Sequence, residues 1–192
     1  MSWPGTRLGK LPPRSLDDEQ KALYDTIAGG RRAQGPQLFR LLDDQGRLEG
    51  PFNAFLLQPR LGAALQAVGT AVRYETSLPE RAREIAILVV SLHWDSAFEW
   101  YAHEAVARSV GVTDAELAGL RAHDWDVLAG DEAVVARTTY LLASAGDLDD
   151  DAYGQAVAVL GQPALFELLT LVGYYAALAL QLRVFRVSAP AP

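Results

Sequence analysis

Residues 77–111 constrain the fold of this chain most, because they contain two consecutive helix patterns. Ser77 and a proline two residues later are typical of a helix start, with the serine as N-cap. Residues 85–92 are nearly all apolar, and their β-branched members would also suit a strand. The length and the cap favour a helix to about His93. A second helix over residues 96–110 ends at a glycine, so we predict a helical hairpin.

The rest of the sequence also predicts helices. Cap residues, glycine stops and apolar periodicity place them at residues 15–29, 60–75, 113–122, 131–145, 149–160 and 163–187. We find no repeat and no strong strand signal, so the expected fold class is all-α. We expect a single domain in which residues 1–50 form an N-terminal arm with one helix and a loop, and residues 51–187 form a helical domain. The last helix is apolar nearly all round, which predicts a subunit interface.

Composition limits the possible functions. The chain has 192 residues and no cysteine, which excludes disulfides, thiolate metal sites and thiol catalysis. A net charge of −7 argues against nucleic acid or an anionic membrane as a partner. The start of the chain lacks the pattern of a signal peptide, and the apolar stretch of residues 168–180 is too short to span a bilayer. We therefore expect a cytoplasmic protein.

An acid and an imidazole share an apolar face of the second helix. At helical spacing, Glu99, His103 and Val106 fall on one stripe, whereas Glu104 and Arg108 fall on another side as an exposed ion pair. A buried carboxylate or imidazole needs a partner, and Glu99 and His103 can supply one for each other. Burial and a neighbouring charge can tune both groups towards neutral pH, so we interpret the pair as a candidate proton-transfer site. The alternative is a structural hydrogen bond.

Glu84 is the third candidate catalytic residue. It aligns with the apolar Leu88 and Leu92 on the first helix, so it borders the core and can face Glu99 across the hairpin. Alternatively, Glu84 only interacts favourably with the helix dipole. Two acids near one imidazole predict a raised pKa for His103 and for at least one acid.

Other residues are candidates for substrate binding: Ser96, Trp100, Tyr174 and Arg183. Each has a structural alternative, namely a helix cap or small filler for Ser96, core or interface packing for the aromatic residues, and a subunit salt bridge for Arg183. His93 could complete a metal site with Glu84, Glu99 and His103, or could complement a helix dipole. We assign no metal ligand and no cofactor in the leading interpretation.

Several segments resemble a known family. Arg81-Ala-Arg83-Glu84-Ile-Ala-Ile-Leu-Val-Val and Phe98-Glu99-Trp100-Tyr101-Ala102-His103 are similar to the carboxymuconolactone decarboxylase family, as are Gly50-Pro51-Phe52-Asn53-Ala54-Phe55 and Val172-Gly173-Tyr174-Tyr175. The resemblance covers about residues 10–187. It implies the helical bundle of the alkylhydroperoxidase D group, assembled as a homotrimer or homohexamer.

The same resemblance implies where the active site lies. The alkylhydroperoxidase D pattern is Glu-x11-Cys-x-x-Cys-x3-His. Glu84 and His103 keep this spacing, but Ser96 and Glu99 stand in place of the two cysteines. A disulfide-forming peroxidase needs those thiols, so this reaction is excluded.

Our leading hypothesis is a cofactor-free acid/base enzyme acting on a small carboxylated lactone or a related carbonyl compound, like a decarboxylase. His103 would donate or shuttle the proton, Glu99 would orient it, Glu84 would assist or fix a water, and an arginine would hold the substrate carboxylate. Two alternatives remain open. One is a non-catalytic helical oligomer that binds a small molecule or a protein. The other is a metal-dependent oxidoreductase that uses the His/Glu cluster.

Overall fold

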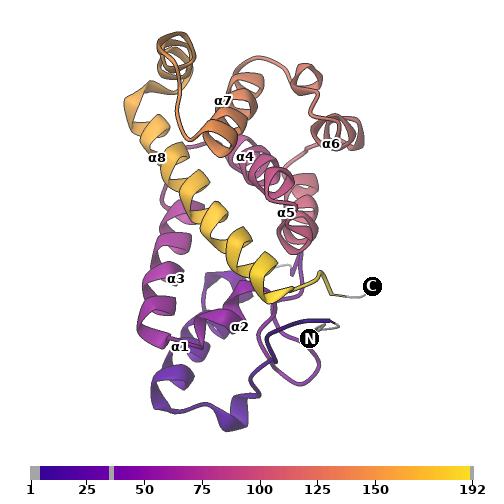
Figure 1. The fold of residues 1–192 in the computed structure, drawn as a ribbon, viewed down its shortest axis with the longest axis vertical. Coiled ribbons are helices and arrows are strands. Elements are labelled where there is room, and N and C mark those ends of the chain that lie inside the picture. The colour runs from indigo at the N-terminus through magenta and orange to yellow at the C-terminus, as the bar shows by residue number, and fades with distance from the viewer. Residues whose placement is uncertain (1–4, 35–36, 191–192) are drawn as a thin grey trace.

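The apolar run of residues 85–90 lies in the central helix of the fold, because a helix that is apolar on every side must be covered on every side. This helix is α4 (Glu80–His93), and Ile85 to Val90 are each at most 1% exposed. α4 packs against α5 (Ala97–Ser109), α7 (Asp131–Ala145) and α8 (Asp150–Phe185). The predicted hairpin is therefore the α4–α5 pair, which Figure 1 shows in the upper half of the molecule.

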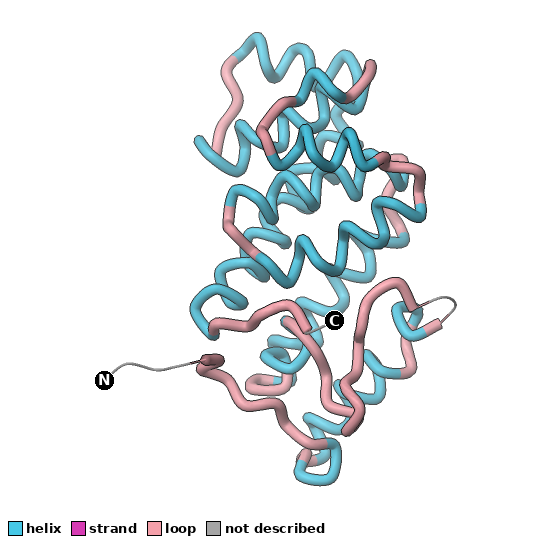
Figure 2. The backbone as a smooth tube through the Cα atoms, turned by 90° about the vertical axis from the view of Figure 1, so that its right-hand side faces the viewer, coloured by secondary structure: helices cyan, strands magenta, loops and turns pink. Residues whose placement is uncertain are grey.

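The computed structural model describes residues 5–34 and 37–190. Within these residues there is no strand, and Figure 2 shows helices joined by loops, which confirms the all-α fold class. The remaining helices are α1 (Asp18–Ala28), α2 (Pro51–Phe55), α3 (Pro59–Tyr74) and α6 (Asp114–Arg121). The short α2 is not among the predicted helices. It follows Gly50, whose φ of 57° and tight contact with the Phe98 ring both require glycine.

The predicted serine cap of α4 is wrong. The N-cap residue is Pro79, and no side chain caps the helix. The backbone N–H and the hydroxyl of Ser77 instead donate to the Glu167 carboxylate of α8, at 2.9 and 3.0 Å. Ser77 therefore joins α8 to the start of α4, a long-range contact that local sequence does not reveal.

α8 is two helices joined at Gly161, whose φ of 71° and ψ of 163° are not helical. Pro163 begins the second half, because a proline lacks the N–H that a helix interior needs. The two predicted helices, residues 149–160 and 163–187, correspond to these halves. Beside α3 and α4 (Figure 1), the second half contributes Leu168, Leu171 and Leu178 to the main core.

α8 also contains a stretch that is long and apolar enough to cross a membrane by length and composition alone, and a third of that stretch is buried in the fold. The expectation from residues 168–180 was that no stretch is long enough. The difference arises because the helix continues well beyond these residues at both ends.

The first fifty residues pack into the same core as the rest of the chain. Leu23 and Ile27 of α1, with Leu41 and Leu48 of the following connection, are at most 5% exposed in one cluster with residues of α2, α4 and α8. At the other end of the arm, the Arg7 N–H donates to the Phe185 carbonyl at 2.8 Å. The arm thus holds the end of α8 beside α2, where the candidate site lies.

Candidate active site

α4 and α5 bring Glu84 and His103 together in the interior. His103 Nδ1 lies 2.7 Å from Glu84 Oε2, and the two residues are 5% and 1% exposed. The expected partner of His103 was Glu99, and this part of the prediction is wrong. Glu99 and His103 do lie on one face of α5 and are both buried. The Nδ1 atom, however, reaches across the hairpin to the facing helix.

The Glu84 carboxylate also lies near two guanidinium groups. Its Oε1 atom is 3.9 Å from Arg83 Nε and 4.0 Å from Arg73 Nη2, too far for hydrogen bonds, and it has no hydrogen-bond partner. Burial alone would raise the pKa of Glu84. The attraction of His103, Arg73 and Arg83 outweighs burial and holds this pKa below its ordinary value. Glu84 is therefore a carboxylate at neutral pH.

His103 is a neutral imidazole at neutral pH. Burial lowers its pKa, the attraction of Glu84 opposes this, and the positive charges of Arg73 and Arg32 add to the lowering. The expectation of a raised pKa is wrong, because burial costs the imidazolium more than a single carboxylate returns. With Nδ1–H donated to Glu84, Nε2 is free to accept a proton.

Glu99 differs chemically from Glu84. It is 3% exposed, and neither of its carboxyl oxygens has a hydrogen-bond partner or a cation within 4 Å among the described residues. Burial raises the pKa of Glu99 to about 8. At neutral pH it is a protonated acid that can donate a proton. The expectation that one acid has a raised pKa agrees with the structure, although the cause is burial and not the neighbouring acid.

A cavity of about 30 Å³ adjoins Glu99 and His103. It has room for about two water molecules. Side chains from separate parts of the chain form its wall, including Arg32, Phe39, Phe52, Arg73, Tyr174 and Tyr175. The Tyr175 ring meets His103 edge to face at 5.1 Å, and the buried Tyr174 hydroxyl has no hydrogen-bond partner.

Of the predicted substrate-binding residues, one lines the cavity and the others lie outside it. Tyr174 lines the cavity. Ser96 is buried and precedes α5 without lining the cavity, and its hydroxyl is unpartnered. Trp100 packs in a separate cluster with Arg121, whose guanidinium lies 3.9 Å from the ring centre. Arg183 is exposed and donates to the Trp94 carbonyl at 3.3 Å. Trp100 and Arg183 are therefore outside the cavity.

Arg32 and Arg73 are site residues that the sequence analysis missed. Arg73 follows a run of twelve residues, 61–72, that contains no charged side chain. An isolated cation in such a helix was the available signal. Arg32 lies in a short 3₁₀ turn of the connection after α1, and nothing in its local sequence marks it.

The four residues proposed for an alternative metal site do not come together, because His93 lies apart from Glu84, Glu99 and His103. His93 is exposed at the end of α4 and stacks edge to face on Trp94 at 6.0 Å. Within residues 5–34 and 37–190, no group of three or more histidine, aspartate and glutamate side chains could hold a metal ion. The donor set therefore does not fit a resident metal.

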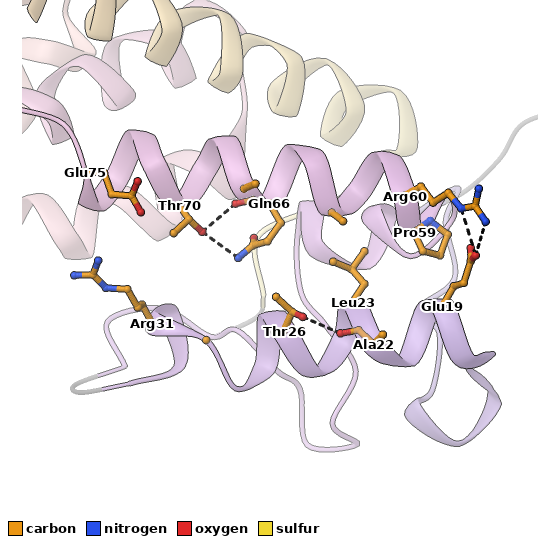
Figure 3. A pocket seen from close by; sticks show the side chains of 13 residues that line it. Glu19, Ala22, Leu23, Thr26, Arg31, Pro59, Arg60, Gln66, Thr70 and Glu75 are labelled. Atoms are coloured by element: carbon orange, nitrogen blue, oxygen red, sulfur yellow. Dashed lines mark hydrogen bonds and ion pairs between the residues drawn. The ribbon is translucent and has the colours of Figure 1, made fainter.

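A larger hollow of about 760 Å³ lies between α1 and α3. Figure 3 shows that several of its polar groups are engaged with one another, whereas Arg31 and Glu75 are drawn with no interaction among the residues shown. Arg60 pairs with Glu19 at 2.8 Å, and the Thr70 hydroxyl donates to the Gln66 carbonyl at 3.0 Å. Its lining contains no histidine and no buried acid, so the reactive groups of the molecule lie at the smaller cavity instead.

The fold is an all-α fold of the alkylhydroperoxidase D-like kind, and it places Glu84 and His103 together in the interior. Residues 59–140 match the family model of the Carboxymuconolactone decarboxylase family. The matched segment contains Arg73, Glu84, Glu99 and His103.

Solved structures support the same fold at low sequence identity. An uncharacterized peroxidase-related protein from Ralstonia eutropha, described as an alkylhydroperoxidase AhpD core, aligns with a TM-score of 0.76 and 9% identity over 98% of this chain and 94% of that chain. A similar protein from Silicibacter sp. has a TM-score of 0.72 and 14% identity over 98% and 94%. The debrominase Bmp8, solved as the C82A variant with 2,3,4-tribromopyrrole, has a TM-score of 0.69 and 11% identity over 100% and 94%. No protein of curated function matches the sequence significantly.

Proposed function

We propose that this chain is an acid/base enzyme acting on a small carboxylated lactone or a related carbonyl compound, in the manner of a decarboxylase. The observation that carries the proposal is the buried Glu84–His103 pair, at 2.7 Å, beside a cavity that also receives the unpartnered acid Glu99. A neutral base and a protonated acid on one small cavity are the two groups that proton transfer needs.

The protonation states assign the roles. In a decarboxylation the bond between the substrate carbon and its carboxylate breaks, and the electron pair moves onto the substrate as an enolate. Glu99 supplies the proton that the carbon then takes up, because Glu99 holds a proton at neutral pH. His103, oriented by Glu84 at Nδ1, takes up a proton from water at Nε2 and passes it to the Glu99 carboxylate, which restores the acid for the next turnover. The proposed donor is thus Glu99, and the orienting acid is Glu84.

Thiol chemistry is not open to this chain, since it contains no cysteine. The peroxidase names of the structural neighbours therefore do not extend to it as a reaction.

We further propose that the chain assembles as a homotrimer or homohexamer. One face of α8 exposes apolar side chains at helical spacing, namely Phe166, Leu169, Leu180 and Val184, which are 44–69% exposed. α3, which lies against α8, exposes Leu61 and Val68. Apolar surface of this extent on two adjoining helices is typical of a subunit interface.

The direct test is turnover of a panel of lactone acids, with released CO₂ as the readout. We expect a compound that wild-type protein decarboxylates and His103→Gln does not, with His93→Gln as the matched control because His93 is exposed. Circular dichroism establishes that each variant is folded. Wild-type rates in the His103→Gln variant would contradict the proposed site. Binding without turnover of any compound would favour the non-catalytic alternative.

A further inference from the structure

The cavity carries more positive than negative charge. Arg32 and Arg73 line it, and within the described part of the chain no carboxylate lies within 4 Å of Arg32. Arg32 contacts neutral groups, donating to the Gln66 amide oxygen at 2.8 Å and lying 5.2 Å from the centre of the Phe52 ring. Arg32 is half-buried, and a cation that loses part of its hydration while it contacts only neutral groups is costly.

The nearest carboxylate does not neutralise Arg73. Glu84 is 4.0 Å from Arg73 Nη2, while it also binds His103 and lies 3.9 Å from Arg83. Its one negative charge thus faces two guanidinium groups, of which Arg83 also lies 3.9 Å from the Glu80 carboxylate, and it accepts a hydrogen bond from the neutral imidazole. Glu99, the acid that lines the cavity, contacts no cation among the described residues. The site is one anion short of balance.

Unused hydrogen-bond donors point to where the anion would sit. Arg73 Nε and the Tyr174 hydroxyl are buried without partners. The Tyr174 hydroxyl and Arg32 Nη2 both lie beside Gly69, because a Cβ at that position would collide with the hydroxyl and lie 2.9 Å from Nη2. Arg32, Arg73 and Tyr174 all line the same cavity, and guanidinium and hydroxyl donors on one cavity wall are typical of a site for a carboxylate.

We infer that Arg73 and Arg32 form an anion subsite, with Tyr174 as an additional donor, that holds the carboxylate of a small ligand beside Glu99 and His103. This inference rests on the proposed function for its catalytic meaning but not for the binding itself. A cavity of about 30 Å³ suits a group of the size of formate, and any larger ligand requires the cavity wall to move.

The first experiment titrates the full chain with ¹³C-formate, followed by NMR, with formamide as the uncharged control. We expect formate to bind and formamide not to bind. Arg73→Met should weaken formate binding about tenfold or more, and Arg73→Lys should retain part of it, because the lost interactions are charge-assisted hydrogen bonds. Arg183→Met is the matched control, since Arg183 is an exposed arginine outside the cavity.

If Arg73→Met does not fold, Arg32→Met makes the same test with the second arginine that lines the cavity. Unchanged formate affinity in a folded Arg73→Met or Arg32→Met variant would overturn the inference, as would equal binding of formamide.

Two further experiments are needed. One distinguishes a substrate carboxylate from a free anion, and the other distinguishes failure of the anion subsite from failure of the proposed reaction. A lactone acid that displaces formate, while its methyl ester does not, identifies the anion as a substrate carboxylate. Formate that no lactone acid displaces assigns the subsite to a free anion. His103→Gln should still bind formate, so binding without turnover would reject the proposed reaction and leave the anion subsite standing.

Discussion

Glu84 Oε2 and His103 Nδ1 lie 2.7 Å apart, although nineteen residues separate them in the chain. This contact fixes the imidazole tautomer, because a carboxylate accepts the Nδ1 proton and leaves Nε2 as the acceptor. It also places a permanent negative charge where an imidazolium would form during the reaction.

Glu84→Gln should lower the rate of any reaction at this site about 10²-fold or more, since the amide can hold the wrong tautomer and cannot stabilise the imidazolium. It should also cost about 3 kcal/mol of unfolding free energy, because Arg73 and Arg83 lose their shared carboxylate. Urea unfolding measures this loss. Glu75→Gln, at an exposed acid after α3, should change the unfolding free energy by less than about 0.5 kcal/mol. Equal effects in both variants would contradict the prediction.

Glu99 makes stability depend on pH. Its pKa rises from the ordinary glutamate value of 4.5 in the unfolded chain to about 8 in the fold. Above pH 4.5 the unfolded chain releases this proton while the folded chain keeps it, so Glu99 lowers the stability of the fold as pH rises towards 8. Glu99→Gln does not lose stability in this way. The unfolding free energy of this variant relative to wild type should therefore increase by up to about 5 kcal/mol from about pH 4 to pH 9. Denaturant unfolding at both pH values provides the measurement, and a constant difference between the two proteins would refute the assignment.

Catalysis should follow a bell-shaped pH profile. The competent form has protonated Glu99 and neutral His103, so kcat/KM should fall above about pH 8 as Glu99 ionises. The acid limb should lie below the ordinary histidine pKa of 6.5, since burial lowers the pKa of His103. Rates measured from about pH 5 to pH 10 test both limbs. An activity that rises steadily through this range would show that Glu99 does not act as the proton donor.

Gly69→Ala should close the cavity. A Cβ at this position would collide with the Tyr174 hydroxyl and crowd Arg32, so ligand binding should weaken about tenfold or more in a folded protein. Gly154→Ala is the control, because a Cβ there meets no atom within 4 Å and Gly154 lies inside a helix. This second change should add about 0.5–1 kcal/mol to the unfolding free energy. Unimpaired formate binding in Gly69→Ala would argue against the placement of the subsite.

The assembly depends on the exposed face of α8. Leu169→Glu should convert the oligomer to monomers, because an interface tolerates an unpaired charge poorly. Sedimentation equilibrium measures the mass. Leu141→Glu on α7 introduces the same charge at a similarly exposed leucine on another helix and should leave the mass unchanged. A wild-type protein that is monomeric at micromolar concentration would reject the proposed assembly.

Local sequence predicts the elements of this fold better than their contacts. The helical spacing of Glu99, His103 and Val106 identifies the buried face of α5, and the ion pair of Glu104 and Arg108 on another side is present at 2.9 Å. The spacing cannot tell which atom of the facing helix lies within reach, so it pairs His103 with the wrong acid. For the same reason Ser77 looks like a cap although it binds α8.

The residues of the cavity wall likewise meet through contacts that local sequence does not predict. Arg32 and Tyr174 are 142 residues apart in the sequence and meet only beside Gly69. No periodicity connects them, because their proximity follows from how the 3₁₀ turn after α1 and helix α8 both pack against α3. Arg32 therefore required the three-dimensional structure, whereas Arg73 was marked by its isolated position in α3.

The site has two origins along the chain. Arg73, Glu84, Glu99 and His103 come from the segment that matches the family, whereas Arg32, Phe39, Tyr174 and Tyr175 come from outside it. The acid and imidazole side chains thus come from the matched segment, whereas the cavity wall draws on that segment through Arg73 and also on stretches outside it. Two proteins that share the family segment can therefore keep one reaction type and accept different compounds, so a substrate assigned from that segment alone should not be transferred between them.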